Sequence, residues 1–173
     1  MQIPPDDLGI TFVQTGGTID KAYPRGDDDH GCCFAIRGPA FRRILRQSHI
    51  MFRAVLRSAA RKDSNDLEPK HLERIKLEVL NSHHPRVVIT HGTDTILRTA
   101  EYLSDDVGDH VVVLTGAMLP ARFVNSDAKF NLGMAVAAVQ SSLPFGVYVA
   151  LYGRVVPWRD YGALSRAYEG RVK

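Results

Sequence analysis

Residues 86–115 read RVVITHGTDTILRTAEYLSDDVGDHVVVLT, and this stretch indicates the fold class. Its two ends, 86–90 and 110–115, are short runs of β-branched and apolar residues, which predict buried strands. The segment 94–103 between them has the length and pattern of a helix. A strand, a helix and a second strand in this order predict a parallel β-α-β unit.

The same alternation continues on both sides of this unit. We expect further strands at 9–15, 50–58 and 146–151, and helices at 39–47, from Pro69 through Leu80, and at 127–141. The prediction is an open, mostly parallel, doubly wound α/β sheet with helices on both faces, forming a single domain over residues 1–173. In such folds ligands bind outside the carboxyl ends of the strands, at a topological switch point. The chemistry is therefore expected in the residues that follow each strand.

The composition is that of an ordinary globular domain, with 173 residues, 45% hydrophobic and 24% charged. The adjacent cysteines Cys32 and Cys33 cannot readily form a disulfide with each other, which favours a reducing compartment. The first residues lack the cationic start and apolar run of a signal peptide. No apolar stretch approaches the roughly 18 residues of a membrane span. We expect a cytoplasmic protein that does not enter the membrane.

The formal net charge of +3 is too small to indicate nucleic-acid binding by itself. The stretch from Arg37 to Lys62, however, contains eight basic residues and no acid. Solvated faces of a helix and a strand account for it, and a site for an anion or a nucleic acid is the alternative. The run DDDH at 27–30 beside the two cysteines, and the histidines at 83–84, match no recognised zinc spacing. They predict polar loops, so no metal is expected.

Small and hydroxyl-bearing residues follow three of the predicted strands. They read TGGTID at 15–20, THGTDT at 90–95 and TGAM at 115–118. Glycine allows tight turns and close approach to the backbone, whose N–H groups bind an anion or a developing oxyanion. Neither G-x-G-x-x-G nor G-x-x-x-x-G-K-[ST] occurs, so these turns do not predict a nucleotide-binding loop.

Five segments together resemble the bacterial-type L-asparaginases. TGGTI at 15–19 and HGTDT at 91–95 are similar to the two threonine motifs of that family, and KDSND at 62–66 to its Ser-x-Asp substrate-binding segment. Tyr23 lies in the loop where the family keeps a catalytic tyrosine. The segment behind the second threonine is matched by GAM at 116–118 with Pro120, Ser126-Asp127 and Phe130-Asn131-Leu132. The matches keep the family's order over roughly residues 10–154.

The resemblance implies catalytic residues for the hydrolysis of a carboxamide. Thr18 is implied as the nucleophile, and a threonine hydroxyl needs a neighbour that accepts its proton. Tyr23 is implied as that proton partner, and an aromatic packed in its loop is the alternative. Thr93 is implied as the second essential hydroxyl, and Asp94 beside it as the group that binds the substrate's α-amino nitrogen. The backbone N–H of Ala117 or of Thr93 is implied at the developing oxyanion.

The resemblance also implies residues that hold the substrate. Ser64 is implied at the α-carboxylate, Asn65 stands where larger members often carry glutamine, and Asp63 and Gly92 complete the set. The implied reaction releases ammonia from L-asparagine, and slowly from L-glutamine, without a cofactor. Judged from the residues alone, Ser64 and Asp66 are also suited to capping the helix that follows.

The sequence departs from the family at a lysine. In the long members a lysine after a Gly-Arg-Asp segment pairs with the Asp of the second threonine motif. Here that position falls near Ala163, and residues 130–172 contain no lysine. Arg159, Arg166 and Lys62 are alternative sources of positive charge, but a guanidinium does not readily relay a proton. A binding protein for an amino acid, with little or no turnover, is therefore the alternative to an enzyme.

Nothing in the sequence corresponds to the C-terminal domain of the long family members. That domain contributes an acid to the site of a neighbouring subunit and helps to build a tetramer. The resemblance is therefore to the N-terminal catalytic domain and to compact members of the family. It implies weaker capture of the substrate's amino group. We also expect a homo-oligomer, a dimer or a tetramer, in which another subunit covers the site.

Overall fold

The computed structural model describes residues 9–23 and 34–172. The cysteines Cys32 and Cys33 and the acidic run at 27–30 lie outside the described residues, so the expectations about them stay predictions. None of the described helices is long and apolar enough to span a bilayer.

A six-stranded sheet forms the centre of the fold, in the order β4-β1-β5-β6-β7-β8. The strands are β1 (Ile10–Gly16), β4 (Ala54–Lys62), β5 (Arg86–Thr90), β6 (Val111–Thr115), β7 (Gly146–Leu151) and β8 (Arg154–Pro157). The first five are parallel and β8 pairs antiparallel with β7. The chain passes from β1 to β4 on one side and returns to β5 on the other, so the switch point lies between β1 and β5.

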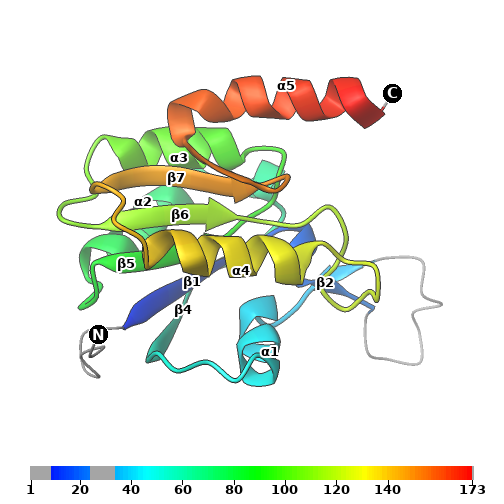
Figure 1. Ribbon diagram of the computed structural model, residues 1–173, viewed down its shortest axis with the longest axis horizontal. Coiled ribbons are helices and arrows are strands. Elements are labelled where there is room, and N and C mark those ends of the chain that lie inside the picture. Colours follow the sequence, from blue (N-terminus) through cyan, green and yellow to red (C-terminus); the bar gives the residue numbers. More distant parts are fainter. Residues whose placement is uncertain (1–8, 24–33, 173) are drawn as a thin grey trace.

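Helices cover both faces of the sheet, as the sequence predicts. The helices α1 (Ala40–Gln47) and α4 (Ala128–Val139) pack on one face, and α2 (Pro69–Leu80) and α3 (Ile96–Ser104) on the other. Figure 1 shows α4 in front of the sheet, α2 and α3 behind it, and α5 (Tyr161–Val172) along its upper edge. The predicted open, mostly parallel, doubly wound α/β fold is therefore confirmed.

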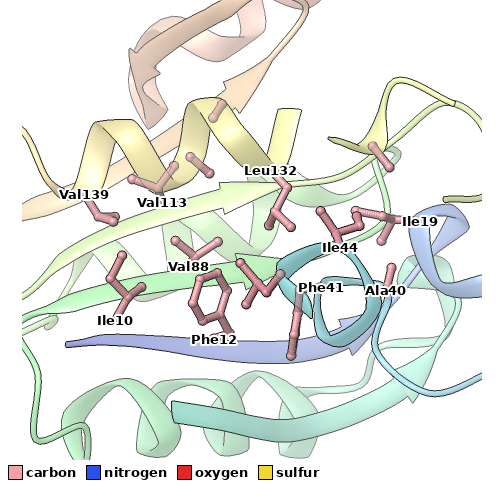
Figure 2. Packing of buried hydrophobic residues seen from close by; sticks show 14 of the residues in the cluster. Ile10, Phe12, Ile19, Ala40, Phe41, Ile44, Val88, Val113, Leu132 and Val139 are labelled. Carbon is pink, nitrogen blue, oxygen red and sulfur yellow. The ribbon is translucent and has the colours of Figure 1, made fainter. Parts of the chain in front are cut away.

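Alternate residues of each central strand enter two separate cores. Phe12 and Val88 belong to the core beneath α1 and α4, and their neighbours Val13 and Ile89 to the core beneath α2 and α3. Figure 2 shows Phe12 between the sheet and Phe41 of α1, with ring centroids 5.5 Å apart. Burying one such side chain contributes roughly 1.5–3 kcal/mol, so both cores hold the strand ends in place.

The strand expected at 50–58 begins and ends four residues later, at Ala54 and Lys62. Ile50 and Phe52 precede it and pack as partly buried residues against the first core. A prediction based only on apolar residues therefore gave the wrong start for this strand. Its later end matters for the site, because Lys62 reaches Gly16 at the end of β1.

Several elements were not expected from the sequence. Between β1 and α1, β2 (Lys21–Ala22) pairs with β3 (Ala35–Ile36) as a small antiparallel sheet. Strand β8 and helix α5 follow β7, where no element was predicted. Three single turns of 3-10 helix complete the described elements: η1 (Thr18–Asp20), η2 (Ser64–Asp66) and η3 (Trp158–Asp160).

The basic stretch is divided between two elements. Arg42 and Arg46 are exposed on α1. Arg57 and Arg61 are exposed along β4, which forms one edge of the sheet, and Arg53 is exposed just before this strand begins. This distribution matches the solvated helix and strand faces expected for the stretch.

Candidate active site

Glycines let the turns after β1 and β5 touch each other through their backbones. Gly16 and Gly17 have φ angles of 113° and 79°, which residues with a Cβ rarely adopt. A Cβ on Gly17 would overlap the main chain of Gly92 and lie 2.7 Å from the carbonyl carbon of His91. A Cβ on Gly16 would likewise collide with the backbone of Lys62, whose carbonyl accepts a hydrogen bond from Gly17 N at 3.0 Å. The first threonine motif is thus held against the loops after β4 and β5.

The segment after β4 meets the second threonine motif. Ser64 is buried beside Gly92, where an added Cβ would lie 2.7 Å from the Cβ of Ser64. The hydroxyl of Thr95 donates to the Ser64 carbonyl at 2.8 Å. Asn65 Nδ2 donates to Asp94 Oδ2 at 3.0 Å, which orients that exposed carboxylate. Two segments that lie 29 residues apart in the sequence therefore form one surface.

Helix α2 begins after Glu68, so the expectation that Ser64 or Asp66 caps it is wrong. The carboxylate of Asp63 instead accepts a hydrogen bond from Asn65 N at 3.3 Å, at the start of η2. This leaves Ser64 as a buried residue at the meeting of three loops. It also leaves its hydroxyl without a capping role.

A buried histidine fixes the second threonine motif to α3. His91 Nδ1 lies 2.8 Å from the Gly92 carbonyl, and Nε2 lies 2.8 Å from the hydroxyl of Thr99. Burial lowers the pKa of His91 to about 4, so the ring is neutral near pH 7. A carbonyl can only accept, which assigns the proton to Nδ1 and makes Nε2 the acceptor of the Thr99 hydroxyl. His91 therefore acts as a positioning residue for Gly92 and Thr93.

Two side chains of α4 and its preceding loop hold the turn after β6. The carboxylate of Asp127 accepts hydrogen bonds from the backbone N–H of Met118 at 3.0 Å and of Leu119 at 3.2 Å. Asn131 Nδ2 donates to the Gly116 carbonyl at 3.1 Å and to Asp127 at 2.8 Å. Ala117 lies buried within this turn. The backbone at Ala117, where the oxyanion donor is expected, is thus fixed by these contacts.

Thr18 and Tyr23 flank the short strand β2. Thr18 is half-buried as the first residue of η1, whereas the Tyr23 side chain is 58% exposed. The Tyr23 ring lies 5.0 Å from that of Phe34 and 6.4 Å from that of Phe123, measured between centroids. Tyr23 therefore belongs to a cluster of three aromatic rings, and more than half of its side chain is exposed.

An ion pair links the loops after β1 and β4. Lys21 Nζ lies 2.9 Å from Asp63 Oδ2, and both side chains are partly exposed. The hydrogen bond from Lys21 lowers the pKa of the Asp63 carboxyl. Lys21 lies two residues after the first threonine motif, and no role was predicted for it from the sequence. Its position, three residues after the predicted nucleophile, could have marked this cation as a site residue.

A buried carboxyl lies beneath η1. Asp20 is 3% exposed, and it accepts hydrogen bonds from Ala40 N at 2.6 Å and from Gln14 Nε2 at 2.9 Å. Burial raises the pKa of Asp20 to about 7, although both hydrogen bonds oppose the rise. Gln14 also accepts from the Ser58 hydroxyl at 3.2 Å. This network connects the first threonine turn to the start of α1 and to β4.

A groove of about 520 Å³ lies between the second threonine motif and α5. Thr93 and Asp94 line one side, and Arg166 lines the other. Of the alternative cations, Arg166 is thus the one that shares a cavity with Asp94, whereas the Arg159 guanidinium lies 4.7 Å from the Trp158 ring centroid. The remaining lining residues are Leu97, Met118, Tyr152, Tyr161, Gly162, Ser165, Tyr168 and Glu169.

Comparison with protein families identifies the chain. Residues 9–163 match a family model described as Asparaginase, N-terminal. The chain belongs to the asparaginase family. The matched range contains every turn described above.

The relatives of this asparaginase-family chain include L-asparaginases and a subunit of an amidotransferase. It is 37% identical over 98 residues to L-asparaginase of Thermococcus kodakarensis, covering 54% of the chain and 30% of the relative. It is 45% identical over 104 residues to L-asparaginase 2 of Escherichia coli, covering 49% and 30%. It is also 33% identical over 165 residues to one subunit of the glutamyl-tRNA(Gln) amidotransferase of Methanococcus vannielii, covering 87% and 36%. The chain thus spans about a third of the length of these relatives.

Solved structures agree with the family. The probable cytoplasmic L-asparaginase of Campylobacter jejuni superposes with a TM-score of 0.72 at 28% identity, covering 87% of this chain and 48% of that one. The thermostable L-asparaginase of Thermococcus kodakarensis gives a TM-score of 0.71 at 27% identity, covering 87% and 46%.

The predicted site residues of this family member fall into two groups. The structure brings Ser64, Asn65, Gly92 and Asp94 into contact, and Asp63 joins them by accepting a hydrogen bond from Asn65 N. The groove along α5 is lined by Thr93 and Asp94, and among the described residues Thr18 and Tyr23 lie outside its lining. Three residues that position the turns, His91, Asp127 and Asn131, belong to the motifs that resemble the family, but the sequence alone predicted no role for them.

Proposed function

We propose that this asparaginase-family chain is an amidohydrolase that converts L-asparagine into L-aspartate and ammonia, with the Thr18 hydroxyl as nucleophile. L-Glutamine is the slower substrate. One observation carries the proposal: the turns after β1, β4, β5 and β6 interlock beside the switch point between β1 and β5. The predicted nucleophile and substrate-binding residues all belong to these turns.

The proposed reaction begins with attack of Thr18 Oγ on the side-chain amide carbon of the substrate. The phenol of Tyr23 accepts the hydroxyl proton while it passes its own proton to the departing nitrogen, so that ammonia leaves. The backbone N–H of Ala117 or Thr93 receives the developing oxyanion. Water then cleaves the ester on Thr18 and releases aspartate. The scheme needs neither a cofactor nor a metal.

The substrate is held by its two charged groups in this proposal. The Ser64 hydroxyl and the backbone around it take the α-carboxylate, and Gly92 leaves room for it. One oxygen of Asp94 accepts from Asn65, so the carboxylate is oriented to receive the α-ammonium group. Asp63, held by Lys21, keeps the loop of Ser64 in place.

The experiment that tests the proposal is ammonia release from millimolar L-asparagine, with a Thr18→Ala variant as control. Turnover that disappears in the variant supports Thr18 as nucleophile. Turnover that persists in the variant contradicts the threonine mechanism while leaving an amidohydrolase.

A binding protein with little turnover is the second candidate, and Ala163 is the observation that favours it. The family's lysine is absent at this position, and Arg166, the cation that shares the groove with Asp94, cannot readily relay a proton. Asparagine or aspartate that raises the melting temperature without any ammonia release would support this candidate.

We also propose that the protein acts in the cytoplasm as a homo-oligomer, a dimer or a tetramer. The likeness to a probable cytoplasmic L-asparaginase supports the compartment. The exposed Tyr23 and Asp94 support a site that a second subunit covers. Molecular mass in solution, measured by light scattering, tests the assembly, and a monomer at micromolar concentration contradicts it.

A further inference from the structure

Stacked tyrosines hold α5 against the loop that follows β7. The ring of Tyr152 lies between those of Tyr161 and Tyr168, with centroids 6.4 and 4.0 Å away and planes within 8° and 14° of parallel. Tyr152 has a φ of 55°, a left-handed conformation that a bulky residue adopts only when its surroundings enforce it. Tyr161 is 4% exposed and belongs to the core beneath α3. The stack therefore sets the position of one face of α5 beside the second threonine motif.

The groove side of α5 carries polar groups at helical spacing. Ser165 and Glu169 lie one turn apart, and their side-chain oxygens approach to 3.4 Å. Arg166 folds back along the helix, so that its Nη1 lies 3.6 Å from where a Cβ on Gly162 would stand. The guanidinium therefore lies close to Gly162, beside the groove that Asp94 lines.

The charge of the groove selects among ligands. Two carboxylates, Asp94 and Glu169, face one guanidinium, Arg166, among the described lining residues. A ligand that brings an ammonium group and neutral amide groups complements this set, whereas a second carboxylate meets net repulsion. The rings of Tyr152 and Tyr168 add an apolar wall.

The groove is also larger than free asparagine requires. Its volume of about 520 Å³ lies within the range of roughly 300–1,000 Å³ found for pockets that enclose drug-sized ligands. Asp94 lines this groove, and its carboxylate also accepts a hydrogen bond from Asn65, which lies outside the groove lining. In the proposed function, which this inference deepens and on which it rests, Asp94 accepts a hydrogen bond from the α-nitrogen of the substrate, which is an ammonium in free asparagine and a peptide N–H in a peptide that ends in asparagine. Whatever is attached to that nitrogen then extends along α5.

We propose that the groove binds a peptide extension on the α-nitrogen, and that peptides ending in asparagine are preferred to free asparagine. Glu169 accepts from the N-terminal ammonium of a dipeptide, and Arg166 donates to its peptide carbonyl oxygen. The tyrosine rings contact the side chain that precedes asparagine. The reaction is unchanged: Thr18 Oγ bonds to the side-chain acyl carbon, that carbon loses its amide nitrogen as ammonia, and water cleaves the ester. The product is a peptide ending in aspartate, and the peptide bond stays intact.

The test compares kcat/KM for ammonia release from three substrates: asparagine, phenylalanyl-asparagine and the reversed dipeptide asparaginyl-phenylalanine. The reversed dipeptide has the same composition but places its extension on the carboxyl side. We expect phenylalanyl-asparagine to exceed asparagine at least about tenfold, as one added buried contact surface allows. We expect the reversed dipeptide to fall below asparagine.

Two variants assign the effect to α5. Glu169→Gln should lower the ratio of phenylalanyl-asparagine to asparagine kcat/KM by at least about fivefold, because the ammonium loses its charged partner. Arg171→Gln removes a charge from the same helix outside the groove lining, and it should leave the ratio at the wild-type value.

The outcomes separate this inference from the proposed function. Hydrolysis of asparagine with no preference for phenylalanyl-asparagine overturns the inference and leaves the proposed function standing. A preference that Glu169→Gln does not reduce overturns the assignment to α5. Hydrolysis of none of the three substrates overturns the proposed function and the inference with it.

Discussion

The two sides of the candidate site are built by different means. Around the switch point, the turns after β1, β4, β5 and β6 touch through backbones, and Gly16, Gly17 and Gly92 leave no room for even one methyl group. Beside α5, the groove is walled by side chains, chiefly stacked tyrosines. Where two backbones touch, few residue types other than glycine fit, whereas a contact between side chains can be made by several different pairs of residues. The first side should therefore keep the family's chemistry, and the second should set what is particular to this chain.

The largest effect is expected at the backbone contacts. Gly17→Ala forces a Cβ into the main chain of Gly92 at a φ of 79°. We expect the free energy of unfolding to fall by about 3 kcal/mol or more, and turnover to fall about a hundredfold. Urea unfolding and ammonia release measure the two quantities.

Gly133→Ala is the matched control, because an added Cβ there meets nothing within 4 Å and the residue lies inside α4. It should stabilise the fold by about 0.5–1 kcal/mol. Equal stability changes at Gly17 and Gly133 would contradict the interlocked turns.

The next effect concerns the turn that carries Ala117. Asp127→Ala removes the acceptor of the Met118 and Leu119 N–H groups. We expect kcat to fall about ten- to a hundredfold with a smaller change in KM, because the oxyanion donor loses its fixed direction. Steady-state kinetics measure the split, with exposed Lys129→Ala as control. An unchanged kcat would remove this turn from the mechanism.

A pH-dependent effect is expected beneath the first threonine motif. Burial raises the pKa of Asp20 from 3.8 to about 7, so the folded state keeps a proton that the unfolded chain has already released. The stability that this proton contributes is complete below pH 4 and is lost as the pH rises through about 7. Between about pH 5 and pH 8, the wild type should lose roughly 2.5 kcal/mol of stability relative to Asp20→Asn. Urea unfolding across this range checks it, and parallel curves for the two proteins would refute the raised pKa.

The smallest effect is expected at the groove beside α5, where the walls are made of side chains. Tyr168→Ala removes one ring of the stack on Tyr152 and should cost about 1 kcal/mol of stability. Phe145→Ala truncates an exposed aromatic as a control and should cost less than about 0.5 kcal/mol. Thermal unfolding compares them, and a loss at Tyr168 as large as that at Gly17 would erase the difference between the two sides.

The parallel part of the fold could be predicted because its strands have one simple signature. β5 and β7 are continuous apolar runs bounded by polar turns, and their predicted bounds match the structure. The start of β4 was predicted wrongly, since Ile50 and Phe52 are apolar for a different reason: they pack against the core before the strand begins.

The elements after β7 could not be predicted from pattern. β8 is a four-residue edge strand that ends in proline, and α5 contains Gly162 and Gly170, which lower helix propensity. Tyr152, Tyr161 and Tyr168 decide the position of α5 by contacts that have no local periodicity. For the same reason the motifs predicted the meeting of Ser64, Gly92 and Asp94 but gave no sign of the groove.

The central place of β1 in the sheet has a consequence for synthesis on the ribosome. The strand β1 precedes both of its partners in the sequence, and these partners span residues 54–62 and 86–90. Its apolar residues therefore have no strand to pair with until residue 62 has been translated, and only one such strand until residue 90 has been translated. Contacts so distant in sequence form slowly and leave aggregation-prone surface exposed meanwhile. The strand that leads into the proposed nucleophile is thus the parallel strand that waits longest for both of its neighbours.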